Sequence, residues 1–506
     1  MLRRDGYPIV LTADRTLMAD YRVLLDGMTA ASQTTRTPAA IMNHLLMPRA
    51  AHPEGQCVVA PLGLRRVEAA LVRGGIDPGD IVVVDDAHLH QAIGPATLVV
   101  GISSGEPHGL GMSSSTMAGI AGGEIYPLAM FRQLLSGVRA YLQARAPQAR
   151  VLLGGPGAWQ LAQDTSSPSS VTPAETGVDH VVVGYSEGNV VEVFSKLLAQ
   201  ESLPAVTLGE GVPVDQIPPI RGATTMGVVE ISRGCGLGCG FCAIATTPMG
   251  HLPTDTILAD VETNLAAAKT ALAALSEDFF RYGASGVHCR PATALALLEQ
   301  IRALKAVRLL QLDHANIASI AQWTDGEIRQ ARDLLVGDQV TRRPWVNVGV
   351  ETAAGELLQA SGGRAKMGAI GPDTWGEVCE EQLRRLCRAG FLPMVSLLVG
   401  LPGETPEHVQ QTLDWVRRFR GEAITLFPVI YAPLDGTAPP VLTRLHWDLV
   451  RECYRFNFKW TPRIYLDDQK GAGAPLSRRL LIQLLAKGQV VLWTGHLARH
   501  RRRAPA

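Results

Sequence analysis

The sequence lacks a long apolar run, an excess of one charge and an abundance of cysteine. No stretch of its 506 residues approaches the ~20 uninterrupted apolar residues that cross a bilayer, so a membrane span is not expected. Lys plus Arg number 47 and Asp plus Glu number 47, so no overall field favours nucleic acid. The first residues contain no apolar secretory segment. We therefore expect a cytoplasmic protein with no nucleic-acid or membrane partner.

Cysteine is scarce, yet three of the eight cysteines lie close together in one glycine-rich segment. Cys235, Cys239 and Cys242 have the spacing C-x3-C-x2-C, and Phe241 directly precedes the last of them. Three thiolates on one loop can hold three irons of a [4Fe–4S] cube and leave the fourth iron without a cysteine from that loop. A zinc site would want four ligands, usually as two separated pairs, and no second pair lies nearby. The pattern therefore predicts an iron–sulfur cluster with one open iron.

The first part of the chain alternates short β-rich runs with amphipathic helices. Strands are predicted over 57–60, 80–85, 97–102, 151–153 and 180–183. Helices are predicted over 64–74, 129–145 and 187–199. This rhythm predicts an α/β, Rossmann-like domain over 57–200, in which ligands bind at the carboxyl ends of parallel strands. Residues 1–56 would then be an N-terminal extension, and the Pro- and Gly-rich segment 201–224 a linker.

Strand signals recur after the cysteine loop at intervals typical of a β/α barrel. They cover 277–282, 309–312, 346–350, 394–399 and 424–430. A parallel barrel over 225–440 would place active groups at the carboxyl ends of its strands. Residues 441–506 are rich in arginine and helix formers, and we expect them to form a helical C-terminal cap.

The cysteine loop resembles that of the radical S-adenosylmethionine (SAM) superfamily, in which SAM chelates the open iron. Gly349-Val-Glu351-Thr resembles the superfamily segment near SAM, and Gly400-Leu-Pro-Gly-Glu-Thr resembles a later turn. Tyr431-Ala-Pro-Leu-Asp-Gly436-Thr resembles the end of the sixth strand. The resemblance implies a partial (β/α)6 barrel, SAM as cofactor and an external electron donor.

One part of the barrel departs from the superfamily pattern. The Gly-Gly-Glu stretch that normally grips the SAM amino group is replaced by a run that begins at Glu277. A carboxylate is a competent iron ligand, so Glu277 is a candidate for the fourth iron. An acidic residue at a strand entrance is also a common cap or salt-bridge partner, and both readings stay open.

The loops of the first domain resemble those of cobalamin-binding domains. In that family a Ser-rich loop follows the third strand, Gly-Gly follows the fourth, and a Gly- and Glu-rich turn follows the fifth. The matching residues here are Ser103, Ser104, Gly154, Gly155, Gly184 and Glu187. Small residues in these loops would let a flat macrocycle approach the backbone.

The family's first loop, D-x-H-x-x-G, has no clear counterpart. Alignment on Gly63 puts Ala60 at the position of the cobalt-binding histidine, which implies that this histidine is absent. Arg65 or Arg66 could lie beneath the corrin, or both could be surface arginines of a helix. A separate Asp86-Ala-His88 fragment lacks the final glycine, so we expect His88 and His90 to be solvent-exposed or locally hydrogen-bonded.

The order of the two resemblances is that of cobalamin-dependent radical SAM methyltransferases. Within that group the chain is most similar to the tryptophan 2-C-methyltransferases of thiostrepton-type antibiotic biosynthesis. This implies transfer of a methyl group from SAM through cobalamin to a carbon, here C2 of an indole. An indole carbon is nucleophilic, so no substrate radical is required. His314 is a candidate acid or base, and Tyr431 a candidate lining residue.

Two other functions remain open at this point. One is radical methylation of an sp3 carbon on a peptide or natural product. The other, from a different class, is a cobalamin-binding sensor in which the cluster is structural.

Overall fold

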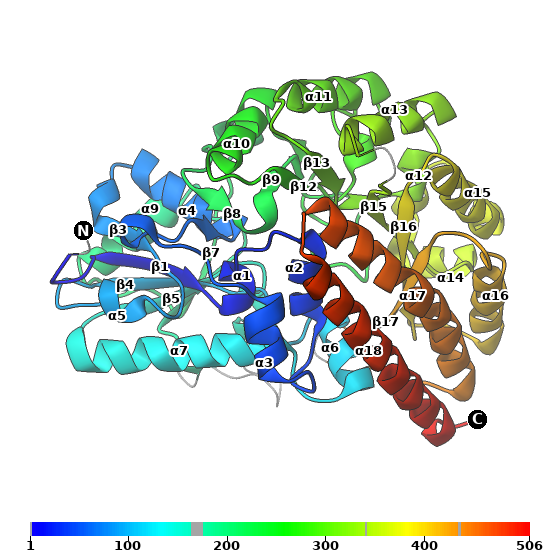
Figure 1. Ribbon diagram of the computed structural model, residues 1–506, viewed down its shortest axis with the longest axis horizontal. Helices are drawn as coiled ribbons and strands as arrows, with labels where there is room; N and C mark the ends of the chain where they lie inside the picture. The colour runs from blue at the N-terminus through cyan, green and yellow to red at the C-terminus, as the bar shows by residue number, and fades with distance from the viewer. Residues whose placement is uncertain (1–2, 163–175, 340–341, 434–436) are drawn as a thin grey trace. The chain divides into compact units, whose positions relative to one another are not determined.

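The computed structural model describes residues 3–162, 176–339, 342–433 and 437–506 (Figure 1). The chain divides into two compact units. Unit 1 comprises residues 1–118, 122–229 and 255–269, and unit 2 comprises residues 119–121, 230–254 and 270–506. None of the described helices is long and apolar enough to cross a membrane.

Unit 1 is built on a six-stranded parallel sheet with the order β3-β1-β4-β5-β6-β7. Its strands are β1 (Ile9–Ala13), β3 (Ile81–Val83), β4 (Val99–Ser103), β5 (Arg150–Gly154), β6 (His180–Val183) and β7 (Val206–Leu208). After β1 the chain adds β3 on one side, and β4 then joins on the other side. The winding therefore reverses between β1 and β4, where such sheets bind ligands.

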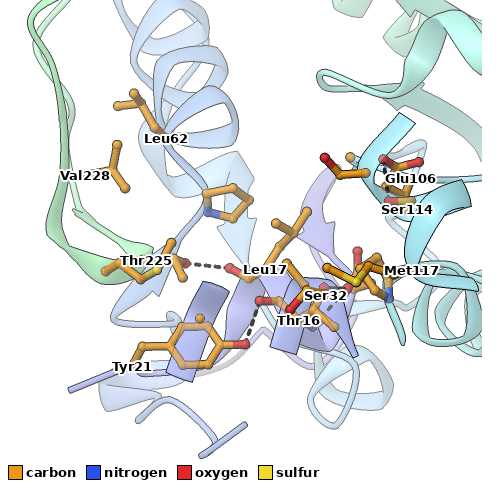
Figure 2. Close-up of a pocket in the computed structure, with 18 residues that line it drawn as sticks. Thr16, Leu17, Tyr21, Ser32, Leu62, Glu106, Ser114, Met117, Thr225 and Val228 are labelled. Atoms are coloured by element: carbon orange, nitrogen blue, oxygen red, sulfur yellow. Dashed lines mark hydrogen bonds between the residues drawn. The ribbon is translucent and has the colours of Figure 1, made fainter. Parts of the chain in front are cut away.

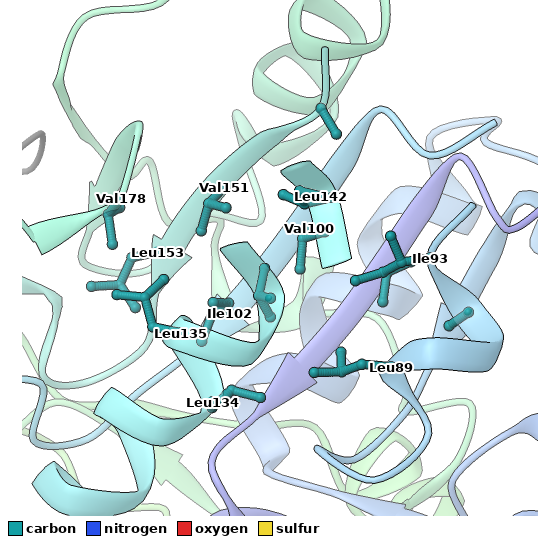
Figure 3. Close-up of a cluster of buried hydrophobic side chains, with 14 of the residues drawn as sticks. Leu89, Ile93, Val100, Ile102, Leu134, Leu135, Leu142, Val151, Leu153 and Val178 are labelled. Atoms are coloured by element: carbon teal, nitrogen blue, oxygen red, sulfur yellow. The ribbon is translucent and has the colours of Figure 1, made fainter. Parts of the chain in front are cut away.

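Both faces of this sheet are buried, because successive side chains of a strand point to opposite faces. Val10 of β1 belongs to the apolar cluster covered by α5 (Leu89–Ala92) and α7 (Tyr126–Arg145), which Figure 3 shows. Ile9 and Leu11 belong to the opposite cluster, which α4 (Leu62–Arg73) and α9 (Val190–Leu198) cover. The core thus fixes the direction in which each strand end points.

The first strand of the sheet is not the predicted one. The run 57–60 forms only β2 (Val59–Ala60), which pairs with β8 (Ala223–Thr224) outside the six-stranded sheet. The first strand is β1, within the segment that we interpreted as an N-terminal extension. The prediction was wrong because the runs 9–13 and 57–60 are both short and apolar. Only their strand pairing distinguishes them. The predicted linker is also wrong in part, since β7 belongs to the sheet.

The other strands and helices of this part agree with expectation. The run 180–183 is β6 without change, and the runs 80–85, 97–102 and 151–153 correspond to β3, β4 and β5. The remaining helices of unit 1 or at its boundary are α1 (Arg15–Met18), α2 (Leu24–Ser32), α3 (Ala39–Ile41), α6 (Met112–Ala121) and α10 (Thr254–Ala266).

Unit 2 contains an arc of parallel strands. The sheets have the orders β13-β12-β9 and β14-β15-β16-β17. The strands within unit 2 are β12 (Ala271–Leu275), β13 (Leu309–Leu312), β14 (His314–Ala315), β15 (Trp345–Glu351), β16 (Leu392–Val399) and β17 (Thr425–Ile430), whereas β9 (Val228–Glu230) lies at the boundary of unit 1. Only Asp313 separates β13 from β14, so the two sheets continue into each other. Among the described strands none closes the arc, which gives the predicted partial barrel.

The strand predicted over 277–282 is wrong. The strand at this place is β12, and a 3-10 turn at Phe279–Arg281 follows it. The side chains of Phe279 and Phe280 are fully buried, and the Ser319 hydroxyl and Asn316 N–H donate to the Asp278 carboxylate at 2.5 and 3.2 Å. The aromatic residues therefore pack a turn. The alanine-rich β12 carries no strong strand signal of its own.

Helices alternate with these strands and then form the cap. They are α11 (Pro291–Ala303), α12 (Ile317–Ile320), α13 (Asp325–Val336), α14 (Gly355–Leu358), α15 (Trp375–Arg388), α16 (Pro406–Arg417), α17 (Arg444–Gly471) and α18 (Leu476–Arg503). Helices α17 and α18, each of 28 residues, confirm the predicted helical C-terminal region.

Helix α17 hydrogen-bonds to β17, a terminal strand of its sheet. The Asn457 side chain accepts a hydrogen bond from the Leu426 N–H and donates one to the Leu426 carbonyl, both at 2.8 Å. The unpaired backbone groups of an edge strand attract other strands unless they are satisfied. Asn457 therefore protects the open side of the arc.

We expect Asn457→Ala to lower the free energy of unfolding by about 1–3 kcal/mol, because it leaves two buried backbone groups of Leu426 without partners. Urea denaturation followed by circular dichroism measures this change. The matched control is Asp467→Ala on the exposed face of the same helix, which should unfold like the parent. Equal midpoints for the two variants would contradict this role of Asn457.

Candidate functional site

The cysteine loop lies between β10 (Ser232–Arg233) and β11 (Gly250–His251), which pair as an antiparallel hairpin. Cys239 is buried, and Cys235 and Cys242 are half-buried. The loop is ordered by its own backbone. The Cys235 N–H donates to the Thr247 carbonyl at 3.0 Å, and the Cys242 N–H donates to the Cys239 carbonyl at 3.1 Å. Three thiols are thus presented by one compact loop.

Glycines are required in this loop by conformation and by space. Gly234, Gly236 and Gly238 all have positive φ, which other residues rarely adopt. A Cβ at Gly234 would lie 2.4 Å from the carbonyl oxygen of Pro248. Phe241 is buried beside the last cysteine. The donor set of three thiols on a tightly turned glycine loop fits a [4Fe–4S] cluster.

A lysine that sequence reasoning missed provides positive charge beside the thiols. Burial raises the pKa of Cys239 to about 11, and the nearby Lys366 ammonium opposes that rise. Burial acts to lower the pKa of Lys366, but Glu351 and Cys239 raise it overall, so this lysine stays charged. Its Nζ lies 3.1 Å from Glu351 Oε1. No local motif identifies Lys366, because 124 residues separate it from Cys242.

The Gly349–Glu351 segment owes its shape to this ion pair. Strand β15 bulges at Val350, and Glu351 has a φ of 66°, which is uncommon for a residue with a side chain. A Cβ at Gly349 would lie 2.3 Å from Glu351 Oε1 and 2.7 Å from Lys366 Nζ. Gly349 is therefore needed for the Glu351–Lys366 pair, which gives a structural reason for the sequence motif.

Glu277 and His314 belong to the same polar region of unit 2. Burial raises the pKa of Cys242, and the Glu277 carboxylate raises it further, so the two groups are neighbours. Burial alone would lower the pKa of the half-exposed His314, but Asp313 and Glu277 raise it to about 9. His314 Nδ1 lies 3.1 Å from the Asp313 carboxylate. The structure thus brings Glu277 and His314 together at the carboxyl ends of β12 and β13.

Two other predicted site residues, Gly400 and Tyr431, lie at the ends of strands, where their backbone groups form hydrogen bonds. Gly400 has a positive φ, its N–H donates to the Glu404 carboxylate at 2.7 Å, and a Cβ there would strike Pro440. Tyr431 follows β17, and its N–H donates to the Val399 carbonyl at 2.9 Å. Gly436 of the same motif lies outside the described residues.

Unit 1 contains a cavity of about 390 Å³ at the carboxyl ends of β1 and β4. Figure 2 shows Thr225 and Val228 on one side of it and Glu106 and Ser114 on the other in this view. Its lining includes Asp14 and Thr16, which directly follow β1. The cavity therefore occupies the switch point of the sheet, where ligands of such folds bind.

The loop after β1 follows the strand beside the switch point of the sheet, where the D-x-H-x-x-G pattern of the cobalamin-binding family would be expected, whereas we had placed it at residues 58–63. Asp14 matches the Asp position of that pattern, but Thr16 and Ala19 stand where it has histidine and glycine. Asp14 Oδ1 accepts hydrogen bonds from the N–H of Thr16 at 2.9 Å and from its hydroxyl at 2.5 Å. Burial raises the pKa of Asp14 to about 6. Residues 58–60 do not end a strand of the six-stranded sheet, so the strand order does not support the alignment that placed Ala60 at the histidine position.

This loop has an unsatisfied group that points to a ligand. Asp14 is fully buried, and its Oδ2 has no hydrogen-bond partner among the described residues. A buried carboxylate oxygen without a partner is costly. A polar group bound in the cavity would relieve that cost.

The predicted cobalamin loops converge on the same edge of the sheet. Ser103 ends β4 and Ser104 follows it, and a Cβ at Gly155 would lie 2.6 Å from the Ser103 hydroxyl, so the segments after β4 and β5 touch. Gly154 faces open space, because a Cβ at this position would have no neighbouring atom within 4 Å. Gly184 likewise faces open space after β6, and Glu187 is buried in the same loop. These openings fit a flat cofactor that approaches the backbone.

Arg65 and Arg66, which we expected either beneath a corrin or on the surface of a helix, are not surface residues. Both side chains are buried and hydrogen-bonded within unit 1. The Arg65 guanidinium donates to the Cys57 carbonyl at 2.7 Å, and that of Arg66 donates to the Asp260 carboxylate at 2.5 Å. Gly63, which anchored the alignment, lies in the first turn of α4 and not after the first sheet strand. Neither arginine lines the described cavity.

Comparison with known sequences identifies the middle of the chain. Residues 229–416 match the family described as the radical SAM superfamily. The ribosomal protein uS12 methylthiotransferase RimO of Parasynechococcus marenigrum is 22% identical over 256 residues, which cover 49% of this chain and 50% of that protein. RimO of Acaryochloris marina is 23% identical over 285 residues, 53% of this chain and 56% of that protein. The chain thus spans about half the length of these curated relatives.

Comparison with solved structures extends over more of the chain. The radical SAM methyltransferase TsrM of Kitasatospora setae, with tryptophan and a SAM analogue bound, matches 85% of this chain and 75% of its own at a TM-score of 0.55 and 17% identity. TsrM with cobalamin and a [4Fe–4S] cluster matches at a TM-score of 0.52 and 16% identity. At these identities the likeness concerns the fold. The chain therefore contains a radical SAM domain within a fold similar to that of TsrM.

Proposed function

We propose that this chain is a methyltransferase that uses SAM, a [4Fe–4S] cluster and cobalamin to methylate C2 of tryptophan. The observation on which the proposal rests is the loop after β1, where the buried Asp14 lines the cavity with one oxygen lacking a described partner and Thr16 would stand in place of a cobalt histidine. The same chain contains the three-cysteine loop of a radical SAM domain. The fold likeness to TsrM, whose structure holds tryptophan and a SAM analogue, supports this choice of substrates.

Cys235, Cys239 and Cys242 would hold three irons of the cluster. Glu277, which neighbours Cys242, is our candidate for the fourth iron. Lys366 would offset the negative charge of the thiolates, and Glu351 would hold Lys366 in place. The Gly349–Glu351 segment would then border SAM, as the superfamily resemblance implies.

The edge loops of unit 1 would hold the cobalamin. Gly154 and Gly184 leave room for it, and Asp14 Oδ2 offers an acceptor. When bound, cobalamin supplies a cobalt centre that can relay a methyl group from SAM to a carbon. Thr16 keeps its hydroxyl on Asp14 and offers no imidazole. If Thr16 lay near the cobalt it would supply no nitrogen ligand, and the chemistry supplied there would be transfer of a methyl cation equivalent, which a nucleophilic indole can accept.

His314 and Tyr431 are our candidates at the acceptor. His314 lies beside two carboxylates and is half-exposed, so it can exchange a proton with a bound substrate. Tyr431 follows the last strand of the arc and offers an aromatic surface to an indole. An external electron donor would keep the metal centres reduced.

The deciding assay incubates the reconstituted protein with tryptophan and methyl-labelled SAM. The proposal expects labelled 2-methyltryptophan without a matching amount of 5′-deoxyadenosine. Formation of 5′-deoxyadenosine in step with the methylated product would favour the radical alternative. The sensor alternative expects no methylation at all. It also expects cobalamin-dependent behaviour to stay unchanged when Cys235, Cys239 and Cys242 are replaced by alanine.

We expect Cys239→Ser to lower the iron content after reconstitution from about four per chain to below about one, because two thiolates do not retain the cube. Iron analysis and the charge-transfer absorbance of the cluster measure this. Cys289→Ser, which changes a half-buried cysteine outside the loop, should retain the parent iron content. Equal iron in both variants would refute the cluster assignment.

We expect Glu277→Gln to lower the methylation rate by at least about tenfold while the iron content stays near that of the parent, because the amide is a poorer ligand of iron than the carboxylate. The cluster's electron paramagnetic resonance signal should also change. Glu299→Gln on the exposed part of α11 is the control. An unchanged rate and spectrum would exclude Glu277 from the fourth iron.

We expect Gly154→Val to keep the fold but to lower bound cobalamin by at least about tenfold, because its side chain would occupy the space that now lies open beside Gly154. Cobalamin absorbance after gel filtration measures this. Gly137→Val in α7, whose Cβ position is also open, is the matched control. Full cobalamin content in the Gly154 variant would contradict the proposed site.

A further inference from the structure

Three side chains with metal-binding chemistry meet in unit 1 beyond the sites described above. His52 precedes β2, Asp85 follows β3, and His88 begins α5. One potential ligand atom from each residue lies within 4.8 Å of the other two. From the sequence we expected His88 to be solvent-exposed or locally bonded, and its hydrogen bond to Asp85 is such a local bond, but no local pattern links it to His52.

The spacing of these atoms resembles that of a metal site. His88 Nδ1 lies 2.6 Å from Asp85 Oδ1, and His52 Nε2 lies 3.5 Å from the same oxygen. Ligands at about 2.0–2.1 Å from a tetrahedral zinc are roughly 3.3 Å apart. The two imidazole rings are stacked, with centroids 3.6 Å apart and an interplanar angle of 21°. Small movements of the half-exposed His88 would therefore let all three atoms reach one ion.

His52 is held in the state that binds a metal. Its Nδ1 lies 3.1 Å from the Ala50 carbonyl, which can only accept, so Nδ1 carries the proton and Nε2 keeps its lone pair. Nε2 then faces the Asp85 carboxylate oxygen at 3.5 Å and has only a long contact, 3.4 Å, with the Asp85 N–H. Asp85 Oδ1 also accepts a hydrogen bond from the Ala87 N–H at 3.1 Å, which fixes the direction of this oxygen, and a cation could share both Oδ1 and His52 Nε2.

The surrounding charges also suit a dication. Arg49 donates to Asp85 Oδ2 at 3.0 Å and to the Asp86 carboxylate at 2.8 Å. Arg15 also interacts electrostatically with both carboxylates, so two guanidiniums balance the two carboxylates and no net positive charge opposes a cation beside the two imidazoles. Arg49 orients Asp85 and leaves its Oδ1 directed at the histidines.

We propose that His52 Nε2, Asp85 Oδ1 and His88 Nδ1 bind a divalent transition-metal ion of the zinc class. Two imidazole nitrogens and one carboxylate oxygen suit zinc, iron, nickel or copper better than magnesium or calcium. Binding requires the proton on His88 Nδ1 to move to Nε2, which the partly exposed ring can present to water. Three protein ligands leave one position for water. The ion would join the segment before β2 to the end of β3.

The test measures zinc in the full-length protein after cluster reconstitution, so that the loop cysteines are occupied by iron. After dialysis against micromolar zinc, metal analysis should find about one zinc per chain in the parent. We expect His88→Ala to weaken zinc binding by more than about 100-fold. Loss of a metal ligand lowers the affinity more than loss of a residue that only hydrogen-bonds to a ligand. His90→Ala, which removes an exposed histidine of the same helix, should bind zinc like the parent.

X-ray absorption at the zinc edge separates this site from adventitious binding to cysteines. The proposal expects nitrogen and oxygen neighbours at about 2.0–2.1 Å, whereas sulfur neighbours would lie at about 2.3 Å. Asp85→Asn is a second variant that keeps hydrogen-bonding capacity and should also weaken binding. No bound zinc in the parent, a sulfur shell, or parent-like affinity in folded His88→Ala would overturn the proposal. These readouts do not depend on methyl transfer.

Discussion

Parallel strand pairing is the constraint on which both candidate sites depend. Because parallel strands all end at the same edge of a sheet, loops that are far apart in sequence converge there. In unit 1 this brings the loop after β1 beside those after β4 and β5, and forms a cavity at the switch point. In unit 2 the same rule brings Glu277, after β12, beside His314, after β13. The chemistry of each unit is thus placed by its backbone topology.

Buried charges then give each site its specific character. Lys366 is held by Glu351 beside three thiols, and the bulge in β15 together with Gly349 provides the space for that pair. Asp14 is buried with one oxygen bound to Thr16 and the other without a described partner. Such arrangements cost stability unless a ligand or a counter-charge compensates them. Their presence at the two sites is an argument for function that packing alone does not explain.

The sequence predicted much of the architecture correctly where local patterns are strong. Continuous β-branched runs gave β6 and β3, and amphipathic spacing gave α4, α7 and α9. It was wrong where a short apolar run has two possible partners. Val59–Ala60 and Ile9–Ala13 look alike as strands, but only β1 has a place between β3 and β4. That error displaced the predicted first loop and assigned Arg65 and Arg66 to a cofactor, although both are bound to groups of their own unit.

The sequence by itself determined those properties that depend on residues close together in the chain. The three cysteines with their glycines, the paired small residues after the strands and the balanced charge can all be read along the chain. Tertiary structure alone decided which distant residues meet. Lys366 lies beside Cys239, Thr16 takes the position expected for a histidine, and His52 faces His88, because strand pairing and packing join segments whose separation in sequence carries no local signal.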